Sequence, residues 1–284
     1  MITLSNGHQM DFLVSSGALA YSGYGWPWDW PLVWSGVIKP EEFTIDTKSF
    51  TRYYREGNYR WYRPWSVLRP LAGGCWVNSF GLSNPGLAWG LRKFNPYPWE
   101  DLNIILSIFP TSPEECSEMC QMAEGAKIVG IEVDVSCPNV DSTRGVVSIC
   151  RAAKESTSIP LIAKFGYQHP TWLIREVAPY FQALHLINAV LWATVFPHKK
   201  SPLARYGGGG VSGPIIQPFC EDKLKELAGV GVPIIAGGGI DSIEVVKRYA
   251  ELGASAFSFG TLFLNRPWEP NRIARKWRQN SLSL

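Results

Sequence analysis

The sequence lacks the features that would place it at a membrane or on nucleic acid. It has no run of about eighteen apolar residues, and its N-terminus (MITLSNGHQMDFLV) has no basic region followed by a long hydrophobic one. We therefore expect a soluble, cytoplasmic protein. It also has no block of like charges, and its net charge of +3 is too small to favour nucleic acid. A small-molecule partner is the expectation that remains.

Closely spaced CxxC pairs are also missing among the six cysteines. Cys116 and Cys120 are four residues apart on an expected helix and could share a face that holds a metal, but no second ligand pair has matching spacing. We interpret them as small apolar residues, with reduced thiols and no bound metal. No group of cysteines suits an iron–sulfur cluster, so any such cluster would come from a partner.

What the sequence does contain is a regular alternation of strands and helices. The 284 residues are 46% hydrophobic, enough for one large α/β barrel or two ordinary domains. The expected strands are FLVSS (12–16), FTIDT (43–47), CWVNSF (75–80), NIILSI (103–108), KIVGIEVDVS (127–136), PLIAKF (160–165), ALHLINAV (183–190), VPIIAG (232–237) and SAFSF (255–259). Alternation with helices, and strands apolar on both faces, predict a parallel (β/α)8 TIM barrel formed by residues 1–284 as a single domain.

Expected helix-cap residues support the predicted alternation of strands and helices. In SPEECSEMCQMAEG, Ser112 is the expected N-cap, Pro113 takes the first helical position and Glu115 completes a capping box. In DSIEVVKRYAELG, Asp241 marks the start and Gly253 the C-cap.

Aromatic-rich insertions near the N-terminus interrupt the alternation. GYGWPWDWPLVW (23–34) and YRWYRPWSVLRPLAGGCW (59–76) contain many of the 13 tryptophans between prolines. A carbohydrate platform or a membrane-dipping patch is an alternative, but we favour local packing in a long loop. If these segments cover the mouth of the barrel, their aromatic rings would wall a ligand pocket.

Polar residues end several of the expected strands. The stretch EVDVSCPNV (132–140) is an apolar run that stops in a thiol, a proline and an amide, and other strands end in Thr47 and Lys48, in Asn78, in Lys164 and in Asn188. In a (β/α)8 barrel the chemistry lies at the carboxyl ends of the strands. Two lysines and three amides are thus expected to converge on one face.

Glycines are concentrated in the last third of the chain. GGGGVSGP (207–214), AGGGI (236–240) and FGT (259–261) lie at strand ends or before helices. Glycine lets an anion approach the backbone N–H groups closely, and barrels commonly bind phosphate after strands seven and eight. These loops indicate a ligand that carries phosphate.

Together these motifs resemble the dihydroorotate dehydrogenase family of FMN barrels. The matching motifs, in order, are Thr47-Lys48-Ser49, NSFGLSNPG (78–86), VSCPN (135–139), IAKF (162–165), LIN (186–188), GGVSGP (209–214), GGGI and GASAFSFGT (253–261). The resemblance runs from about Val14 to Pro267. Soluble family members, which lack an N-terminal membrane helix, carry a cysteine base in the first of the catalytic loops, as this chain would.

The resemblance implies a role for the cysteine that ends the apolar strand. Cys137 would be the general base that removes a proton from the carbon next to the substrate carbonyl, while hydride leaves the neighbouring carbon for N5 of FMN. Pro138 would stiffen the turn, and Asn139 would hydrogen-bond the ligand. Lys164 would stand near the N1–O2 edge of the flavin and stabilise its anionic reduced form.

The resemblance also implies two sets of binding residues. The substrate would be bound by Lys48, Asn78, Phe80, Gly81, Leu82, Asp134, Asn139 and Asn188. FMN would be bound by Ser15, Ser16, Gly17, Thr47, Lys48, Ser49, Lys164, Asn188, Ser212, Gly213, Gly238, Gly239, Gly260 and Thr261.

Two positions depart from the family pattern. Asp134 stands where the family has asparagine, and Ala189 stands where it has serine or threonine. An ionised carboxylate only accepts hydrogen bonds, so an unpaired Asp134 facing the ligand would disfavour an orotate-like anion. We therefore expect poor turnover of dihydroorotate and better turnover in Asp134→Asn.

Three functions are consistent with the sequence. The first is an FMN-dependent oxidoreductase that oxidises dihydroorotate to orotate, or acts on a related cyclic amide. The second is a phosphate-binding isomerase or lyase without flavin, and the third is a flavin-binding protein that has lost catalysis. The resemblance suggests a homodimer. The electron acceptor could be fumarate, a quinone, oxygen or a separate electron-transfer subunit.

Overall fold

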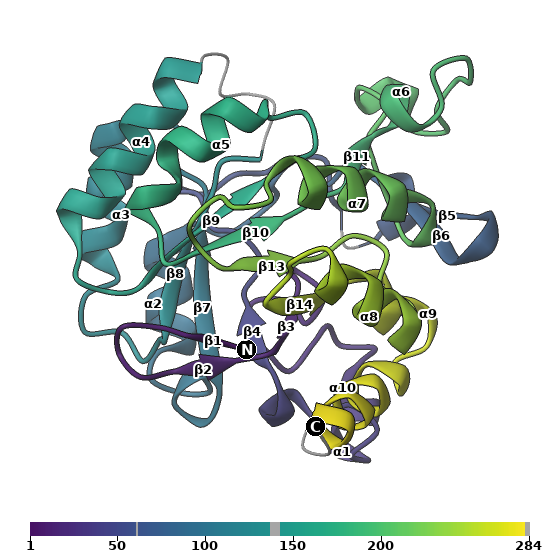
Figure 1. The fold of residues 1–284 in the computed structure, drawn as a ribbon, viewed down its shortest axis with the longest axis horizontal. Helices are drawn as coiled ribbons and strands as arrows, with labels where there is room; N and C mark the ends of the chain where they lie inside the picture. The colour runs from purple at the N-terminus through teal and green to yellow at the C-terminus, as the bar shows by residue number, and fades with distance from the viewer. Residues whose placement is uncertain (61, 137–142, 282–284) are drawn as a thin grey trace.

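A computed structural model of the chain describes residues 1–60, 62–136 and 143–281, and its centre is a closed barrel of eight parallel strands (Figure 1). In chain order these are β3 (Phe12–Val14), β4 (Thr44–Asp46), β7 (Asn103–Ile108), β8 (Gly130–Asp134), β9 (Leu161–Phe165), β10 (Ala183–Leu186), β13 (Ile234–Ala236) and β14 (Ala256–Phe259). β14 pairs with β3 and closes the barrel. The (β/α)8 architecture predicted from the alternation of strands and helices is confirmed.

Helices follow most of the barrel strands. They are α1 (Trp30–Trp34), α2 (Leu87–Phe94), α3 (Pro113–Met122), α4 (Thr143–Ser156), α5 (Thr171–Val177), α6 (Trp192–Val195), α7 (Gln217–Glu226), α8 (Ile243–Glu251), α9 (Thr261–Asn265) and α10 (Glu269–Ser281). The first unit is the exception, because only the short α1 and a single turn of 3-10 helix (Pro40–Glu42) lie between β3 and β4. The proline-rich and tryptophan-rich segment around it has no long amphipathic repeat.

The predicted caps are partly right. Ser112 caps α3 by accepting a hydrogen bond from the Glu115 backbone N–H at 3.2 Å, but the Glu115 carboxylate accepts from the N–H of Thr111 instead of closing the box on Ser112. In α8 the N-cap is Ser242 and not Asp241, whose carboxylate accepts from Gln217. The C-cap is Leu252, and Gly253 follows it with the positive φ that glycine supplies after a helix.

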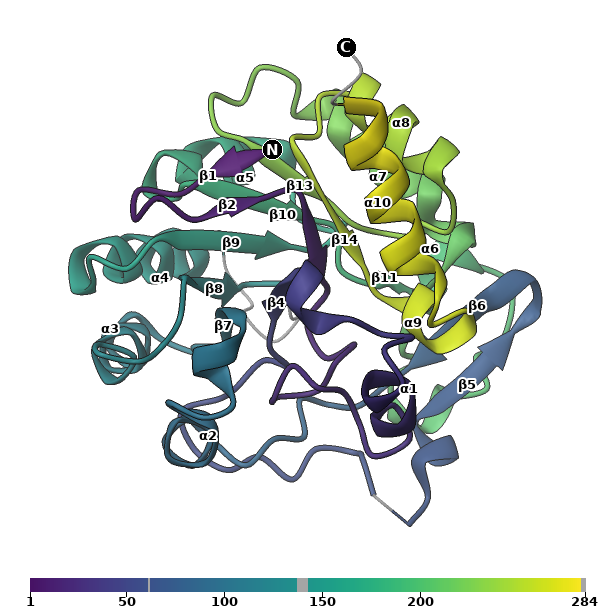
Figure 2. The ribbon, with the colours of Figure 1, turned by 90° about the horizontal axis from the view of Figure 1, so that it is seen from below.

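A second sheet lies at one side of the barrel, away from α3 and α4 in both Figure 1 and Figure 2. It is antiparallel and four-stranded, in the order β11 (Val190–Leu191), β12 (Gly210–Ser212), β6 (Cys75–Asn78) and β5 (Leu68–Leu71). The segment CWVNSF thus forms a strand, as predicted, but outside the barrel. Its alternating burial, with Cys75 and Val77 buried, is the pattern of a sheet that has one covered face.

The core has an outer and an inner part. The outer part packs the helices on the barrel and includes Cys116 and Cys120, both fully buried, which supports their interpretation as small apolar residues. The inner part fills the lower half of the barrel. It consists of Leu13, Ile105, Ile162, Ala183, Ile235 and Ala256, covered by Ile2, Leu4 and Met10 of the N-terminal hairpin β1 (Ile2–Thr3) and β2 (Gln9–Met10).

Two residues further along these strands the interior becomes polar. Ser15, Ser107, Lys164, His185 and Ser258 follow the inner apolar positions at the two-residue spacing of side chains on one face of a strand. The barrel therefore has an apolar lower layer and a polar layer beneath the carboxyl ends of its strands. Among the described residues, no helix is both long enough and apolar enough to cross a bilayer.

Candidate functional site

A pocket of about 910 Å³ opens at the carboxyl ends of the barrel strands, next to the four-stranded sheet. Most of the predicted site residues line it. They are Ser15, Ser16, Gly17, Lys48, Ser49, Asn78, Phe80, Gly81, Leu82, Asp134, Lys164, Asn188, Ser212, Gly238, Gly239, Gly260 and Thr261. Residues from nine separate stretches of the chain thus meet in one cavity, as expected for the functional end of a (β/α)8 barrel.

Among the described residues, two of the predicted set do not line the pocket, and two more predicted residues lie outside the described ranges. Thr47 is fully buried, and its hydroxyl accepts the backbone N–H of Ser107 at 3.0 Å, so it supports the barrel wall instead of facing the ligand. Gly213 lies behind the lining, where its carbonyl faces Gly239. Cys137 and Asn139 lie outside the described residues, as does Pro138 between them.

Lys164 is the central cation of the polar layer. It projects from β9 and is 5% exposed, and its Nζ lies 3.1 Å from Glu132 Oε1 and 3.2 Å from Asp46 Oδ2. Burial alone would lower the pKa of Lys164, but the charges of Glu132 and Asp46 raise it above its usual value. The lysine is therefore held as an ammonium ion at the base of the pocket.

The two carboxyl groups around this lysine are not equivalent. Burial and the neighbouring Glu132 raise the pKa of Asp46 well above its usual value. Burial would also raise the pKa of Glu132, but Lys164 and His185 beside it hold that pKa below the usual range. Of the two carboxyl groups, Asp46 therefore holds a proton more readily than Glu132, and Glu132 is the ionised partner of Lys164.

Asp134 lines the pocket, but its carboxylate is hydrogen-bonded. The expectation from the sequence, which depended on an unpaired carboxylate, is corrected on this point. Its Oδ2 accepts the hydroxyl of Ser49 at 3.0 Å. Its Oδ1 accepts the backbone N–H of Ser136 at 3.0 Å and also the Ser136 hydroxyl. Asn188 joins this set by donating its amide to Ser136 Oγ at 2.6 Å. The carboxylate is thus fixed by three donors, while its negative charge stays at the pocket.

Lys48 provides a second cation at the pocket wall. Its Nζ donates to the backbone carbonyl of Ser83 at 2.6 Å and lies 5.4 Å from the centre of the Tyr21 ring. Burial lowers the pKa of Lys48 to about 8, although the charge of Asp134 opposes this effect. Lys48 therefore changes its charge close to physiological pH, whereas Lys164 does not.

The aromatic insertions form part of the pocket wall, as the sequence suggested. Trp26 stacks on Trp28 with ring centres 5.5 Å apart, and Tyr59 contacts Phe80 at the same centre distance. Trp26 Nε1 donates to the carbonyl of Gly17 at 3.0 Å, which ties the insertion to the end of β3. These rings give one side of the pocket an apolar surface suited to a planar ligand.

One end of the pocket is rich in glycine. Gly239 has a φ of +82°, and a Cβ added there would lie 2.7 Å from the backbone carbonyl oxygen of Gly213. The loop after β13 can therefore approach the loop after β12 only if this residue has no side chain. Gly238, Gly260 and Thr261 complete this end of the pocket with exposed backbone and a small hydroxyl.

Gly239→Ala should lower the free energy of unfolding by about 2–4 kcal/mol, since strain from positive φ and the clash with Gly213 add together. The matched control is Gly253→Ala, which has a φ of +97° but open space around its Cβ. The control should cost only the strain of about 1–2 kcal/mol. Urea unfolding of both variants measures the difference, and equal losses would refute the steric part of the argument.

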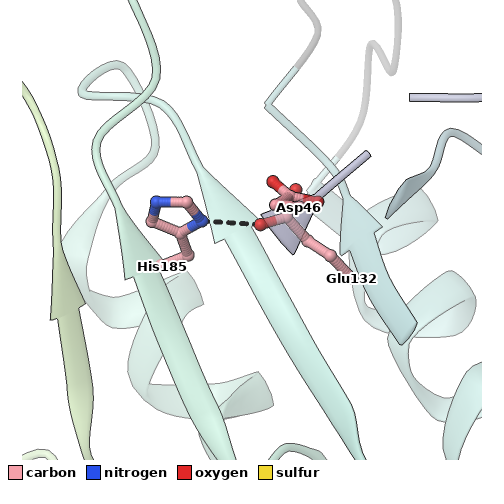
Figure 3. A group of neighbouring side chains, drawn as sticks. All are labelled: Asp46, Glu132 and His185. Carbon is pink, nitrogen blue, oxygen red and sulfur yellow. Dashed lines mark hydrogen bonds and ion pairs between the residues drawn. The ribbon is translucent and has the colours of Figure 1, made fainter. Parts of the chain in front are cut away.

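Sequence reasoning missed Asp46, Glu132 and His185, which are 0%, 1% and 2% exposed. A signal for them was present, because each is an ionisable residue inside an otherwise apolar strand. Figure 3 shows the three side chains pointing toward one another from β4, β8 and β10. The three residues can be recognised as a cluster only once the closed barrel places β4, β8 and β10 around the same interior.

Comparison with known proteins gives consistent results. A sequence model of the family described as dihydroorotate dehydrogenase matches residues 37–280. The catalytic subunit of dihydroorotate dehydrogenase B (NAD(+)) from Anoxybacillus flavithermus is 30% identical over 214 residues, which are 70% of this chain and 68% of the relative. The protein of the same name from a Geobacillus species is 30% identical over 247 residues, which are 81% of this chain and 76% of the relative.

A solved structure agrees with the fold. The crystal structure of dihydroorotate dehydrogenase from Eimeria tenella in complex with ferulenol superposes with a TM-score of 0.73. The match covers 99% of this chain and 85% of that chain at 16% identity. At this identity the likeness concerns the barrel fold alone.

Proposed function

Because the chain belongs to the dihydroorotate dehydrogenase family, whose members are oxidoreductases, we propose that it is an FMN-dependent enzyme that oxidises dihydroorotate to orotate or acts on a related cyclic amide. The observation that carries the proposal is the buried ammonium of Lys164, held charged at the base of a pocket that has a glycine-rich end and an aromatic wall. A fixed cation of this kind is what stabilises a flavin when it gains negative charge.

The chain's own residues fit FMN. Gly238, Gly239, Gly260 and Thr261 would hold the phosphate end, because their backbone can be approached closely by an anion. Lys164 would face the ring, with Ser15 and Ser16 beside it. When bound, FMN supplies the two-electron acceptor for oxidation of a carbon–carbon single bond.

The remaining roles concern protons and orientation. Cys137, three residues after the last residue of β8 in the sequence, is proposed as the general base that removes the proton next to the substrate carbonyl. Asn139 and Asn78 would hydrogen-bond the substrate. Asn188 would do the same in an orientation set by Ser136, which accepts its amide N–H. Lys48 would attract the substrate carboxylate.

Binding of orotate should weaken as the pH rises above about 8. Lys48 is charged below its lowered pKa of about 8 and attracts the orotate carboxylate, and this attraction is lost as the ammonium deprotonates at higher pH. Affinity measured by calorimetry should fall by up to about tenfold per pH unit in this range. Lys48→Arg, which stays charged, should remove the pH dependence. A wild-type affinity that is flat from pH 7 to 10 would contradict the role of Lys48.

Asp134→Asn should raise the affinity for orotate and the turnover of dihydroorotate by up to about tenfold. The substitution removes one negative charge from the pocket wall while an amide keeps hydrogen-bonding capacity toward Ser49 and Ser136. Uracil, which has the ring of orotate without the carboxylate, is the matched control ligand, and its affinity should not change. A variant that binds both ligands as the wild type does would refute the charge argument.

The proposal extends to partners and location. The relatives from Anoxybacillus and Geobacillus are named catalytic subunits of NAD(+) enzymes, and this supports a separate electron-transfer subunit for the present chain. We also propose a homodimer, a cytoplasmic location and a single catalytic barrel domain. Size-exclusion chromatography with light scattering tests the oligomeric state.

FMN titration of the full-length protein tests the cofactor. We expect FMN to bind with a stoichiometry of one per chain, monitored by quenching of flavin fluorescence. Riboflavin, which lacks the phosphate, is the matched control and should bind at least about tenfold more weakly, since the glycine-rich end would have no anion to hold. Equal affinity for the two flavins would refute the assignment of the phosphate end, and no binding of either would refute the proposed function.

A further inference from the structure

The ion pairs around Lys164 belong to a larger buried network. Glu132 uses both carboxylate oxygens: Oε1 accepts from Lys164 and from the Ser107 hydroxyl at 3.0 Å, and Oε2 lies 2.6 Å from His185 Nδ1. The imidazole and Glu132 face each other in Figure 3. A carboxylate oxygen can only accept here, so Nδ1 of His185 carries the hydrogen and Nε2 is left as the acceptor.

The acceptor side of His185 leads to the pocket. Its Nε2 lies 2.7 Å from the hydroxyl of Ser258, and this hydroxyl accepts from Ser15 Oγ at 3.1 Å. Ser15 lines the pocket, and so does His185 itself. Because Nε2 must accept, Ser258 donates to it, and both serine hydroxyls therefore point from the pocket toward the imidazole. This is the arrangement needed to deliver a proton from the pocket to His185.

The positive and negative charges of the buried network nearly cancel. At the centre of the network the ionised Glu132 and the Lys164 ammonium balance each other beside a neutral His185, and Asp134 adds a negative charge at the pocket wall. Any further negative charge at the pocket, or loss of the lysine charge, leaves a net negative charge in the barrel interior, where an uncompensated charge is costly. His185 is the neutral basic group with a direct connection to the pocket.

The cluster of Asp46, Glu132 and His185 is not suited to binding a metal ion. Two carboxyl groups and an imidazole are common metal ligands, and here their ligand atoms lie within 4.8 Å of one another. However, the Lys164 ammonium already lies against both carboxyl groups, and it would repel a divalent cation between them. The cluster is therefore suited to holding protons.

We propose that His185 is a positioning residue that balances charge at the pocket, taking up one proton through Ser15 and Ser258 when the pocket gains a negative charge. The inference rests on the proposed function, because reduction of FMN is the event that would add the charge. In that step a chemical reductant supplies two electrons to FMN, one proton joins FMN, and a second proton from solvent passes to Nε2 of His185.

The groups that face His185 set the direction of this response. β8 contributes Glu132 and Asp134, β9 contributes Lys164 and β4 contributes Asp46, whereas β13 and β14 contribute no titratable side chain in their described residues. Burial and Lys164 lower the pKa of His185, and Glu132 and Asp134 oppose this. The imidazole is thus neutral at rest, and removing positive charge or adding negative charge favours its protonated form.

Nitrogen NMR of the histidine rings tests the proposal on the full-length protein, because ring ¹⁵N shifts distinguish a neutral tautomer from an imidazolium. The chain has only four histidines, and the signals of His185 are identified by their loss in His185→Gln. In oxidised, FMN-loaded wild type at pH 7.5 we expect the neutral form with the hydrogen on Nδ1. After anaerobic reduction by dithionite we expect the imidazolium, while the rings of His8 and His198 stay unchanged.

A second NMR experiment does not require FMN. In Lys164→Met without cofactor, His185 should be an imidazolium at pH 7.5, because the lysine charge that disfavours it is gone. A neutral His185 in this variant, or in the reduced wild type, would overturn the proposal. If Lys164→Met does not fold, the wild-type comparison alone decides. If the protein takes up no FMN, the proposed function fails, and the Lys164→Met arm still decides whether His185 responds to charge.

Discussion

Replacing Lys164 with methionine is expected to lower the free energy of unfolding by about 3–5 kcal/mol, because it leaves the buried carboxylate of Glu132 without its cation. Glu132 and Asp46 are 1% and 0% exposed, so water cannot take the place of the lysine. Urea unfolding at pH 7, followed by tryptophan fluorescence on protein without cofactor, measures the loss. The loss should grow as the pH rises, because a protonated His185 compensates for part of it only while it keeps its proton.

Two further variants make this result specific. Lys225→Met removes a lysine that is 58% exposed and 3.9 Å from its acidic partner, and it should cost less than about 0.5 kcal/mol. Adding Glu132→Gln to Lys164→Met removes the unpaired charge and should restore part of the lost stability, although each single substitution is destabilising. If Lys164→Met unfolds at the wild-type urea concentration, Lys164 is not the counter-charge of the barrel interior.

Cys137→Ala is expected to lower the rate of cofactor reduction by substrate by about 100-fold to 10,000-fold, the usual contribution of a positioned general base. Its effect should be confined to the substrate step. Reduction of the same variant by dithionite should proceed as in the wild type, because no proton is removed from a carbon in that reaction. Anaerobic stopped-flow absorbance measures both rates.

Cys150→Ala is the matched control for this substitution. Cys150 is fully buried in α4, in the outer core, and its thiol has no part in the proposed chemistry. Its loss should affect stability and leave substrate-driven reduction within about twofold of the wild type. A Cys137→Ala variant that is reduced by substrate as fast as Cys150→Ala would show that another group is the base.

The barrel could be predicted because its strands are apolar on both faces. NIILSI (103–108) has the bounds of β7, and PLIAKF (160–165) differs from β9 by one residue. The partner of a strand is harder to predict, since β6 has a strand-like sequence but pairs with β5 and β12 outside the barrel. The local sequence determines whether a segment tends to form a strand, whereas the strand it pairs with depends on residues far along the chain.

The pocket lining was predicted better than the network below it. Lys48, Asp134, Lys164 and Asn188 lie at or close to the carboxyl ends of barrel strands, and this position is enough to bring such residues together. Asp46 and Lys164 are 118 residues apart and belong to strands that are not neighbours in the barrel. Their ion pair, and the contact of Glu132 with His185, depend on the closed barrel and on the side that each strand turns inward.

The central claim is that this pocket binds FMN and oxidises a dihydroorotate-like substrate. The most direct test is the anaerobic absorbance spectrum of the purified, full-length protein before and after addition of dihydroorotate. We predict a flavin spectrum that bleaches, slowly in the wild type and faster in Asp134→Asn. A colourless protein that also fails to take up added FMN would contradict the account.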